Sequence, residues 1–357
     1  MKRAGGVSPA PRDVAIVIRS GPGVTTGNRP LTLEIRLGWP MGLLNLFHRK
    51  PKATRINPAA VATRAEPTPV PGTRPPFAVR SFGLSDRGQV RPANEDRFVI
   101  VELARTMYVH ETNLPQSAAK YSSHRGHVLL VADGVGGHLG GEVASALTVE
   151  AIEEFLLNTL KRFSNLQAGE VPNALKELES GFFDAEARIF GEAAEHPEWR
   201  GMGTTLTLAF AVNWMLFIAH AGDSRCYLFS RGELHQLTLD HTVAAELMRR
   251  GVLSPGGGAR HPFRHVVTNL LGGSRPGVQV ELHRLDLHPD DVILLCSDGL
   301  TEMIPDERIA VILREAPDPR RACERLVAES NRHGGKDNIT VLVARVEDPG
   351  SQTQAAG

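Results

Sequence analysis

Five apolar runs, each with an acidic residue at one end, constrain the fold of this 357-residue chain most strongly. Each run has the length of a buried strand and is bounded by turn residues. The acidic positions at the run ends are Glu95 with Asp96, Asp133, Asp223, Asp298 and Asp337. Because a buried strand holds its ends rigidly, the pattern predicts one rim of carboxylates.

This rim is a candidate metal site, because neighbouring carboxylates repel one another unless cations neutralise them. Hard divalent cations with oxygen ligands fit it. Asp133 opens the run Asp-Gly-Val-Gly-Gly, and we interpret it as a residue that bridges two metals. The glycines let the backbone approach closely, so the carbonyl of Gly134 can also be a ligand. Alone, the motif is more typical of a glycine-rich strand-to-helix turn, but acids recur at several strand ends.

Arg91, five residues before Asp96, is a candidate phosphate ligand. A planar guanidinium group matches two phosphate oxygens, although a surface ion pair is the alternative for this residue. Metals and an arginine together indicate two-metal hydrolysis, in which the cations hold a hydroxide and stabilise an in-line displacement at phosphorus. The sequence contains no Gly-x-Ser-x-Gly, His-Glu-x-x-His or P-loop motif.

Charge and cysteine usage exclude some other functions. Lys plus Arg equals Asp plus Glu, 40 each, but residues 1–77 hold twelve of the basic and three of the acidic residues. The remainder is therefore acidic, which disfavours nucleic-acid binding. Three widely spaced cysteines without a Cys-x-x-Cys pair predict neither disulfides nor a zinc site, and they fit a reducing cytoplasm.

Composition divides the chain into three parts. Residues 1–77 contain half of the 24 prolines and are predicted to be a basic, disordered extension. A docking or membrane-surface role is the alternative for this extension, and Met41 is an alternative start. Residues 78–348 have the pattern of one globular domain, and residues 349–357 form a short polar tail. No stretch approaches the ~20 apolar residues of a membrane span.

The periodicity of the globular part predicts strands combined with paired helices, an α+β arrangement. Strands are expected at 77–84, 97–103, 127–132, 204–212, 214–220, 225–230, 277–285, 291–297 and 338–346. Helices are expected from Gly140, at 172–194, at 306–315 and at 319–332. Arg231-Gly232 is expected to form a hairpin turn, and residues 241–275 look irregular and partly helical.

Seven sequence blocks, in order, resemble those of the metal-dependent protein phosphatases, the type-2C serine/threonine family in its bacterial form. The blocks are SDRGQVRPANED (85–96), VADGVGGHLGGEVAS (131–145), GMGTTL (201–206), AGDSR (221–225), LTLDH (237–241), LCSDGL (295–300) and GKDNIT (335–340). They spread over residues 78–346. One block alone would be weak evidence, but seven in order are highly specific.

The resemblance implies a four-layer α-β-β-α sandwich, with two central antiparallel sheets flanked by helix pairs. It also implies Mg²⁺ or Mn²⁺, with two catalytic ions and a third in bacterial members. It implies that Asp133 bridges the two catalytic metals and that the Gly134 carbonyl is a further ligand. Asp298 and Asp337 would complete one metal, and Glu95 and Asp96 would bind the other metal or its waters. Asp223 with Asp298 would hold the third metal, and Arg91 would bind the phosphate.

Two segments depart from the family pattern or vary within it. Eukaryotic members often have a histidine, proposed as the general acid, where this chain has Val135, so the acid is unassigned. Residues 241–275 correspond to a variable flap beside the site. Arg264 and His265 of the flap are candidates for phosphopeptide binding, with a solvated loop as the alternative, and His265 is a candidate for the third metal.

The expected function is therefore phosphoserine and phosphothreonine hydrolysis by a cytoplasmic monomer. Its substrates would be phosphorylated proteins, including the targets of a serine/threonine kinase and the kinase itself. Two alternatives remain open on the sequence. One is a non-catalytic regulator that binds phosphoproteins on the same fold, and the other is a two-metal phosphoesterase that acts on nucleotides or nucleic acid.

Overall fold

The computed structural model describes residues 78–108, 119–136, 140–158, 171–258 and 261–347. The predicted extension (1–77) and polar tail (349–357) lie outside the described residues, so their boundaries stay predictions. No helix among the described residues has the length and apolar character needed to cross a membrane.

Two five-stranded antiparallel sheets form the centre of the fold. One has the order β1 (Ala78–Asp86), β13 (Ile339–Glu347), β12 (Val292–Cys296), β8 (Arg225–Ser230) and β9 (Glu233–Gln236). The other has the order β11 (Glu281–Asp286), β7 (Met215–Ala221), β6 (Leu206–Val212), β3 (Ala119–Ala132) and β2 (Arg97–Tyr108).

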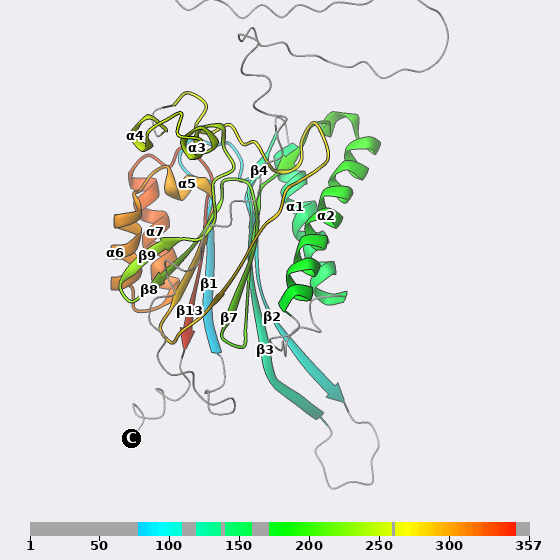
Figure 1. The fold of residues 1–357 in the computed structure, drawn as a ribbon, viewed down its shortest axis with the longest axis vertical. Coiled ribbons are helices and arrows are strands. Elements are labelled where there is room, and N and C mark those ends of the chain that lie inside the picture. Colours follow the sequence, from blue (N-terminus) through cyan, green and yellow to red (C-terminus); the bar gives the residue numbers. More distant parts are fainter. Residues whose placement is uncertain (1–77, 109–118, 137–139, 159–170, 259–260, 348–357) are drawn as a thin grey trace, which may run out of the picture. The chain divides into compact units, whose positions relative to one another are not determined.

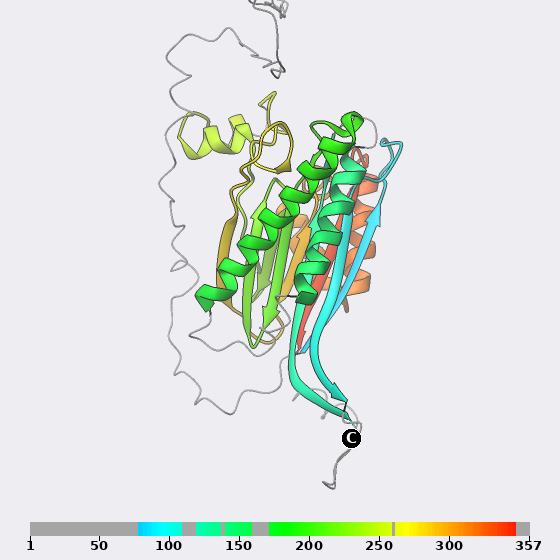
Figure 2. The same ribbon diagram turned by 90° about the vertical axis from the view of Figure 1, so that its right-hand side faces the viewer.

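Helix pairs cover the outer faces of both sheets, which confirms the predicted α-β-β-α sandwich (Figure 1). Helices α1 (Gly140–Asn158) and α2 (Val171–Glu195) lie side by side over the β2-to-β11 sheet (Figure 2). Helices α6 (Asp306–Glu315) and α7 (Pro319–Arg332) cover the other sheet.

The continuous apolar runs follow from burial on both faces of each sheet. In β3, Val128 and Leu130 pack towards the helix side, whereas Leu129 and Val131 pack between the sheets. The same alternation occurs in β12, where Leu294 packs on the helix side. Each fully buried aliphatic side chain contributes about 1.5–3 kcal/mol, so these strands hold their ends firmly.

Short elements lie at the end of the sandwich that carries the predicted rim. A small sheet has the order β10 (Leu271–Gly272), β5 (Gly203–Thr204) and β4 (Gly134–Val135). The short helices are α3 (Val243–Arg249), α4 (Pro255–Gly258), α5 (Asp298–Thr301) and the 3₁₀ turn Pro197–Trp199. Residues 241–275 are thus irregular and partly helical, as predicted.

The predicted hairpin turn at Arg231-Gly232 is confirmed, and both residues have positive φ, 52° and 88°. Such a turn matches the twist of the strands it joins, here β8 and β9. The predicted start of β11 was wrong, because this strand begins at Glu281 and not at residue 277. Pro276-Gly277 explains the delay, since proline lacks the N–H that a ladder needs and Gly277 has a φ of 121°.

Candidate active site

The predicted acidic strand ends meet at one end of the sandwich. Asp133 follows β3, and Asp298 begins α5 directly after β12. Figure 1 places β4, which follows Asp133, and α5 at the same end of the two sheets. The carboxylates are close enough to repel one another, since Asp133 experiences charge from Asp96, Asp223, Asp298 and Asp337.

Asp96 is the most enclosed of these acids, with 2% of its surface exposed. Its Oδ2 accepts hydrogen bonds from Ser297 Oγ and Thr340 Oγ1, both at 2.7 Å. Its Oδ1 is buried and has no hydrogen-bond partner. Burial, with repulsion from Asp337, raises the pKa of Asp96 to about 6 despite the two hydroxyl donors. A buried oxygen without a partner is costly, and a cation would satisfy it.

The backbone around Asp133 is fixed by two threonines. The amide N–H of Asp133 donates to Thr205 Oγ1 at 3.0 Å, and its carbonyl accepts from Thr205 N–H at 2.9 Å and Thr204 Oγ1 at 2.8 Å. The side chain is half-buried. Burial, followed by repulsion from Asp96 and Asp298, raises the pKa of Asp133 well above its usual range. The backbone of Asp133 is therefore held in place, at a position where the charge of its carboxylate is disfavoured.

A second group of acids adjoins Asp298. Asp298 is half-buried, and burial, with Asp223 and Glu302 nearby, raises its pKa well above the usual range. Asp223 is 8% exposed, and burial, with Asp240 and Glu302 nearby, raises its pKa to about 7. Carboxylates whose charge is disfavoured by burial and by one another fit a site for divalent cations with oxygen ligands.

Gly134 brings three backbone segments together. A Cβ atom at this position would lie 2.2 Å from the carbonyl oxygen of Gly141 and 2.9 Å from that of Glu95. Any other residue would push β4 away from the start of α1. The backbone at Gly134 thus lies close to the start of α1 and to Glu95, while its carbonyl as a metal ligand stays a prediction. The Glu95 carbonyl also accepts from Ser145 Oγ of α1 at 2.6 Å.

Arg91 lies beside the acids, at the exposed edge of the site. Its Nη2 donates to Asp337 Oδ2 at 2.5 Å, and 53% of its side chain is exposed. The ion-pair alternative for Arg91 thus holds in part, but the partner is one of the predicted metal ligands. Charge from Asp298 and Glu95 also reaches the guanidinium.

Comparison with known proteins identifies the family. Residues 110–334 match the family model described as "Protein phosphatase 2C". A Listeria welshimeri protein named "Serine/threonine phosphatase stp" is 33% identical over 260 residues, which cover 72% of this chain and 92% of the relative. The chain belongs to the protein phosphatase 2C family.

Solved structures of phosphatases share the fold. The Mycobacterium tuberculosis serine/threonine phosphatase PstP/Ppp has a TM-score of 0.61 and 32% identity, covering 75% of this chain and 99% of that one. The catalytic domain of PstP in complex with two manganese ions has a TM-score of 0.60 and 31% identity, covering 76% of this chain and all of that one.

Two flap residues predicted to bind substrate lie differently with respect to the site. His265 Nδ1 contacts a carboxylate oxygen of Glu302, and both have ligand atoms within 4.8 Å of one on Asp298. Arg264 is exposed, and its backbone N–H bonds to the His261 carbonyl. The flap therefore brings His265 to the acids. Val135 is partly exposed at 38%, and its side chain cannot donate a proton.

Several polar residues that support the site were missed from the sequence. Asn338 Oδ1 accepts from Glu95 N–H at 2.9 Å, and its Nδ2 donates to the carbonyls of Arg87 and Ala93. It thus closes the loop that carries Arg91. Ser297 and Thr340 hold Asp96, because their hydroxyl groups donate to its Oδ2. Ser297 precedes Asp298 in the sequence, and Asn338 follows Asp337. This adjacency to a predicted ligand was the one sequence signal that could have identified them.

Proposed function

We propose that this chain is a metal-dependent protein phosphatase that hydrolyses phosphoserine and phosphothreonine in proteins. The observation that carries the proposal is the convergence of Asp133, Asp298 and Asp337 beside Arg91 at one end of the sandwich. Membership of the protein phosphatase 2C family supports it, as do relatives that are named serine/threonine phosphatases.

The acids at this end would hold Mg²⁺ or Mn²⁺, two ions in the catalytic position and a third beside them. The ligands we assign are Glu95, Asp96, Asp133, the Gly134 carbonyl, Asp223, Asp298 and Asp337. The manganese-bound PstP relative supports the choice of metal and the pair of ions. When bound, the ions supply charge neutralisation and an activated water for in-line attack at phosphorus.

The protein residues have separate tasks in this account. Asp133, fixed by Thr204 and Thr205, keeps the ligand set in register between the two sheets. Arg91 binds and orients the phosphate, because its half-exposed guanidinium offers further donors beyond the one that Asp337 holds. Phosphate orientation matters because positioning accounts for much of the catalysis of phosphoryl transfer.

We further infer that the substrates are proteins that a serine/threonine kinase has phosphorylated, including the kinase itself. A monomer in the cytoplasm remains our prediction. The three cysteines, Cys226, Cys296 and Cys323, are all free and buried, which agrees with the expectation of no disulfides.

Phosphate release from a phosphothreonine peptide in the presence of Mn²⁺ tests the proposal. We expect Asp133→Asn and Asp298→Asn to lower kcat/KM by about a hundredfold or more, because each removes a charged metal ligand. Asp286→Asn, which changes an exposed carboxylate on β11, is the matched control and should keep full activity. Equal turnover in all four proteins would refute the proposal. Peptide binding without turnover by the wild type would instead favour the regulator.

A further inference from the structure

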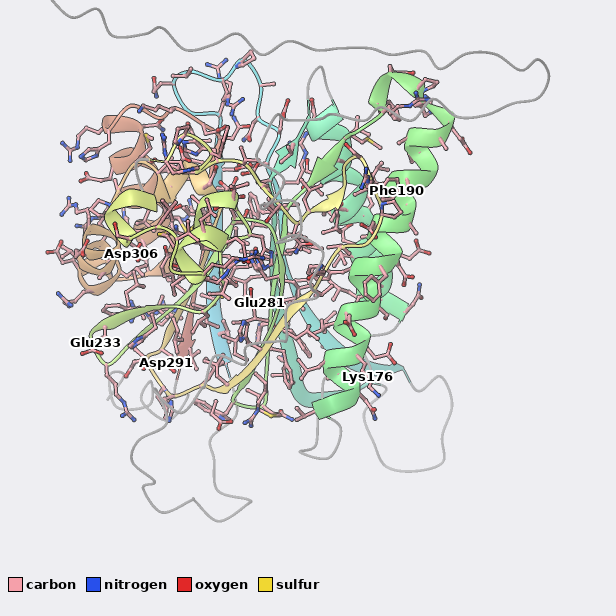
Figure 3. The ribbon with its side chains drawn as sticks, turned by 45° about the horizontal axis from the view of Figure 1, so that its top comes forward. Lys176, Phe190, Glu233, Glu281, Asp291 and Asp306 are labelled. Carbon is pink, nitrogen blue, oxygen red and sulfur yellow. The ribbon has the colours of Figure 1, made fainter. Side chains whose placement is uncertain are left out.

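A cluster of three histidines and one glutamate lies at the base of the flap, next to the turn that carries Asp223. His220 is the penultimate residue of β7, His241 begins the flap, and Glu281 and His283 belong to β11. Glu281 is near the middle of the view in Figure 3. His220, His241 and Glu281 each have a possible ligand atom within 4.8 Å of the others, so a metal site has to be considered first.

The hydrogen bonds of the cluster exclude a metal site as it stands. The backbone N–H of Gly222 donates to His241 Nδ1 at 3.1 Å, so the proton of the neutral ring is on Nε2. His220 Nε2 lies 3.1 Å from two carbonyl oxygens, those of Gly222 and Leu239, and must also carry a proton. A metal-binding nitrogen must be unprotonated. The cluster therefore bonds to the protein itself.

His241 connects the two ends of the flap. Its carbonyl accepts from Thr268 N–H at 2.7 Å and Thr268 Oγ1 at 3.0 Å, near the flap's other end. Asn269 Nδ2 lies 2.9 Å from His241 Nδ1. Asn269 also pairs with the backbone of Gln279, just before β11. His241 thus helps to hold the chain where it enters and where it leaves the flap, together with Val243, whose N–H donates to the Val266 carbonyl at 3.0 Å.

The same histidine holds the turn that carries Asp223. His241 N–H donates to the carbonyl of Gly222 at 2.7 Å, while Gly222 N–H donates to the ring, so the two residues are joined at two points. Gly222 has a φ of 124°, and a Cβ there would lie 2.5 Å from Thr205. The turn is therefore tightly packed against Thr205 and bonded to His241.

Glu281 completes the network from the sheet. It lies 3.3 Å from His241 Nε2, accepts from Leu239 N–H at 3.3 Å and contacts His283 Nε2. Burial alone would raise its pKa, but the hydrogen bonds from His241 and His283 lower the pKa of Glu281 to about 2. Glu281 is therefore an ionised acceptor, and charged acceptors form the stronger hydrogen bonds.

We propose that His241 is a positioning residue that, bound to Glu281, anchors both ends of the flap to the turn carrying Asp223. His265, within the flap, lies against Glu302 beside Asp298. The anchor thus sets where the flap meets the acids. Its effect on catalysis rests on the proposed phosphatase function, but its effect on the flap does not.

Limited trypsin digestion of the native protein tests the anchor directly. The flap contains Arg249, Arg250 and Arg264, and cleavage there follows the population of the released flap. We expect Glu281→Ala to raise the rate of flap cleavage about tenfold or more, as expected for the loss of charged hydrogen bonds. Glu281→Gln, which keeps an acceptor oxygen, should give a smaller increase. His241→Asn should resemble Glu281→Ala.

Glu233→Ala is the matched control, because Glu233 forms an exposed pair with His235 at 3.8 Å on β9. Figure 3 shows Glu233 at the edge of the molecule, away from Glu281. The control should leave flap cleavage unchanged. Flap cleavage in Glu281→Ala that equals the control, with both proteins folded by circular dichroism, would overturn the proposal.

Kinetics separate an anchor from a general loss of structure. For Glu281→Gln we expect KM for a phosphothreonine peptide to rise about tenfold, with kcat changed by less than about threefold. Equal losses of kcat for the peptide and for p-nitrophenyl phosphate, without faster flap cleavage, would contradict a positioning role. An inactive wild type would refute the phosphatase function, yet the digestion would still decide the anchor.

Discussion

At the scale of single residues, Asp223 shows that burying an ionised carboxylate in the site lowers the stability of the metal-free protein. Its pKa is raised from an ordinary 3.8 to about 7 by burial and by nearby Asp240 and Glu302. The folded state therefore binds a proton more tightly than the unfolded state does. Between these two pKa values, the metal-free protein loses stability as the pH rises, and the loss is complete above about pH 7.

Replacing Asp223 with asparagine should consequently stabilise the metal-free protein at pH 8, by up to about 4 kcal/mol. The gain should largely vanish near pH 3, where the carboxyl group is mostly protonated in both states. Urea unfolding in EDTA at the two pH values measures this. An Asp223→Asn protein that is no more stable than the wild type at pH 8 would show that Asp223 is not repelled by its neighbours.

The polar side chains that support the site were the part of it that was hardest to predict from the sequence. Asn338 reaches the carbonyl of Arg87 across 251 positions of sequence, and Arg91 pairs with Asp337 across 246. Such contacts depend on how β1 and β13 align, which periodicity does not encode. The acidic residues at this end of the sandwich were predictable, because each follows or precedes a strand with a strong apolar pattern.

Among the elements, the junction of β4 with the start of α1 depends strongly on residue size. It rests on Gly134, whose Cβ position would lie 2.2 Å from the Gly141 carbonyl oxygen. We expect Gly134→Ala to destabilise the protein by about 1–3 kcal/mol and to weaken Mn²⁺ binding, because Glu95 and Asp133 would be displaced. Thermal unfolding and metal titration of the variant measure both effects.

Gly191→Ala is the control for this prediction. Gly191 is exposed in α2, and a Cβ there would meet nothing within 4 Å. Alanine in a helix interior should stabilise the protein by about 0.5–1 kcal/mol and leave metal binding intact. If Gly134→Ala behaved like Gly191→Ala, the close approach at β4 would not matter for the site.

Element boundaries were predictable where the apolar pattern was long. The helices α2, α6 and α7 and the strands β6, β7, β8 and β12 lie within two or three residues of the predicted ranges. The small sheet of β4, β5 and β10 was missed, because strands of two residues have no periodicity. The hairpin of β2 and β3 extends further than predicted, to Tyr108 and from Ala119 (Figures 1 and 2).

At the scale of the whole molecule, the two sheets bring acids from distant segments to one end of the sandwich. The antiparallel pairing of β2 with β3 places the start of one strand, at Arg97, beside the end of the other, at Ala132. In the other sheet, the antiparallel pairing of β12 with β13 places Cys296, at the end of β12, beside Val341, near the start of β13. The fold class followed from the sequence blocks, whereas the geometry between the sheets required the structure.

The central claim is that these strand ends together bind divalent cations, and calorimetric titration of Mn²⁺ into the metal-free protein tests it most directly. Wild type should bind at least two ions, and Asp133→Asn or Asp298→Asn should lose about 10–100-fold or more in affinity. Asp286→Asn should titrate like the wild type. Mn²⁺ binding that is unchanged in Asp133→Asn and Asp298→Asn would contradict the account.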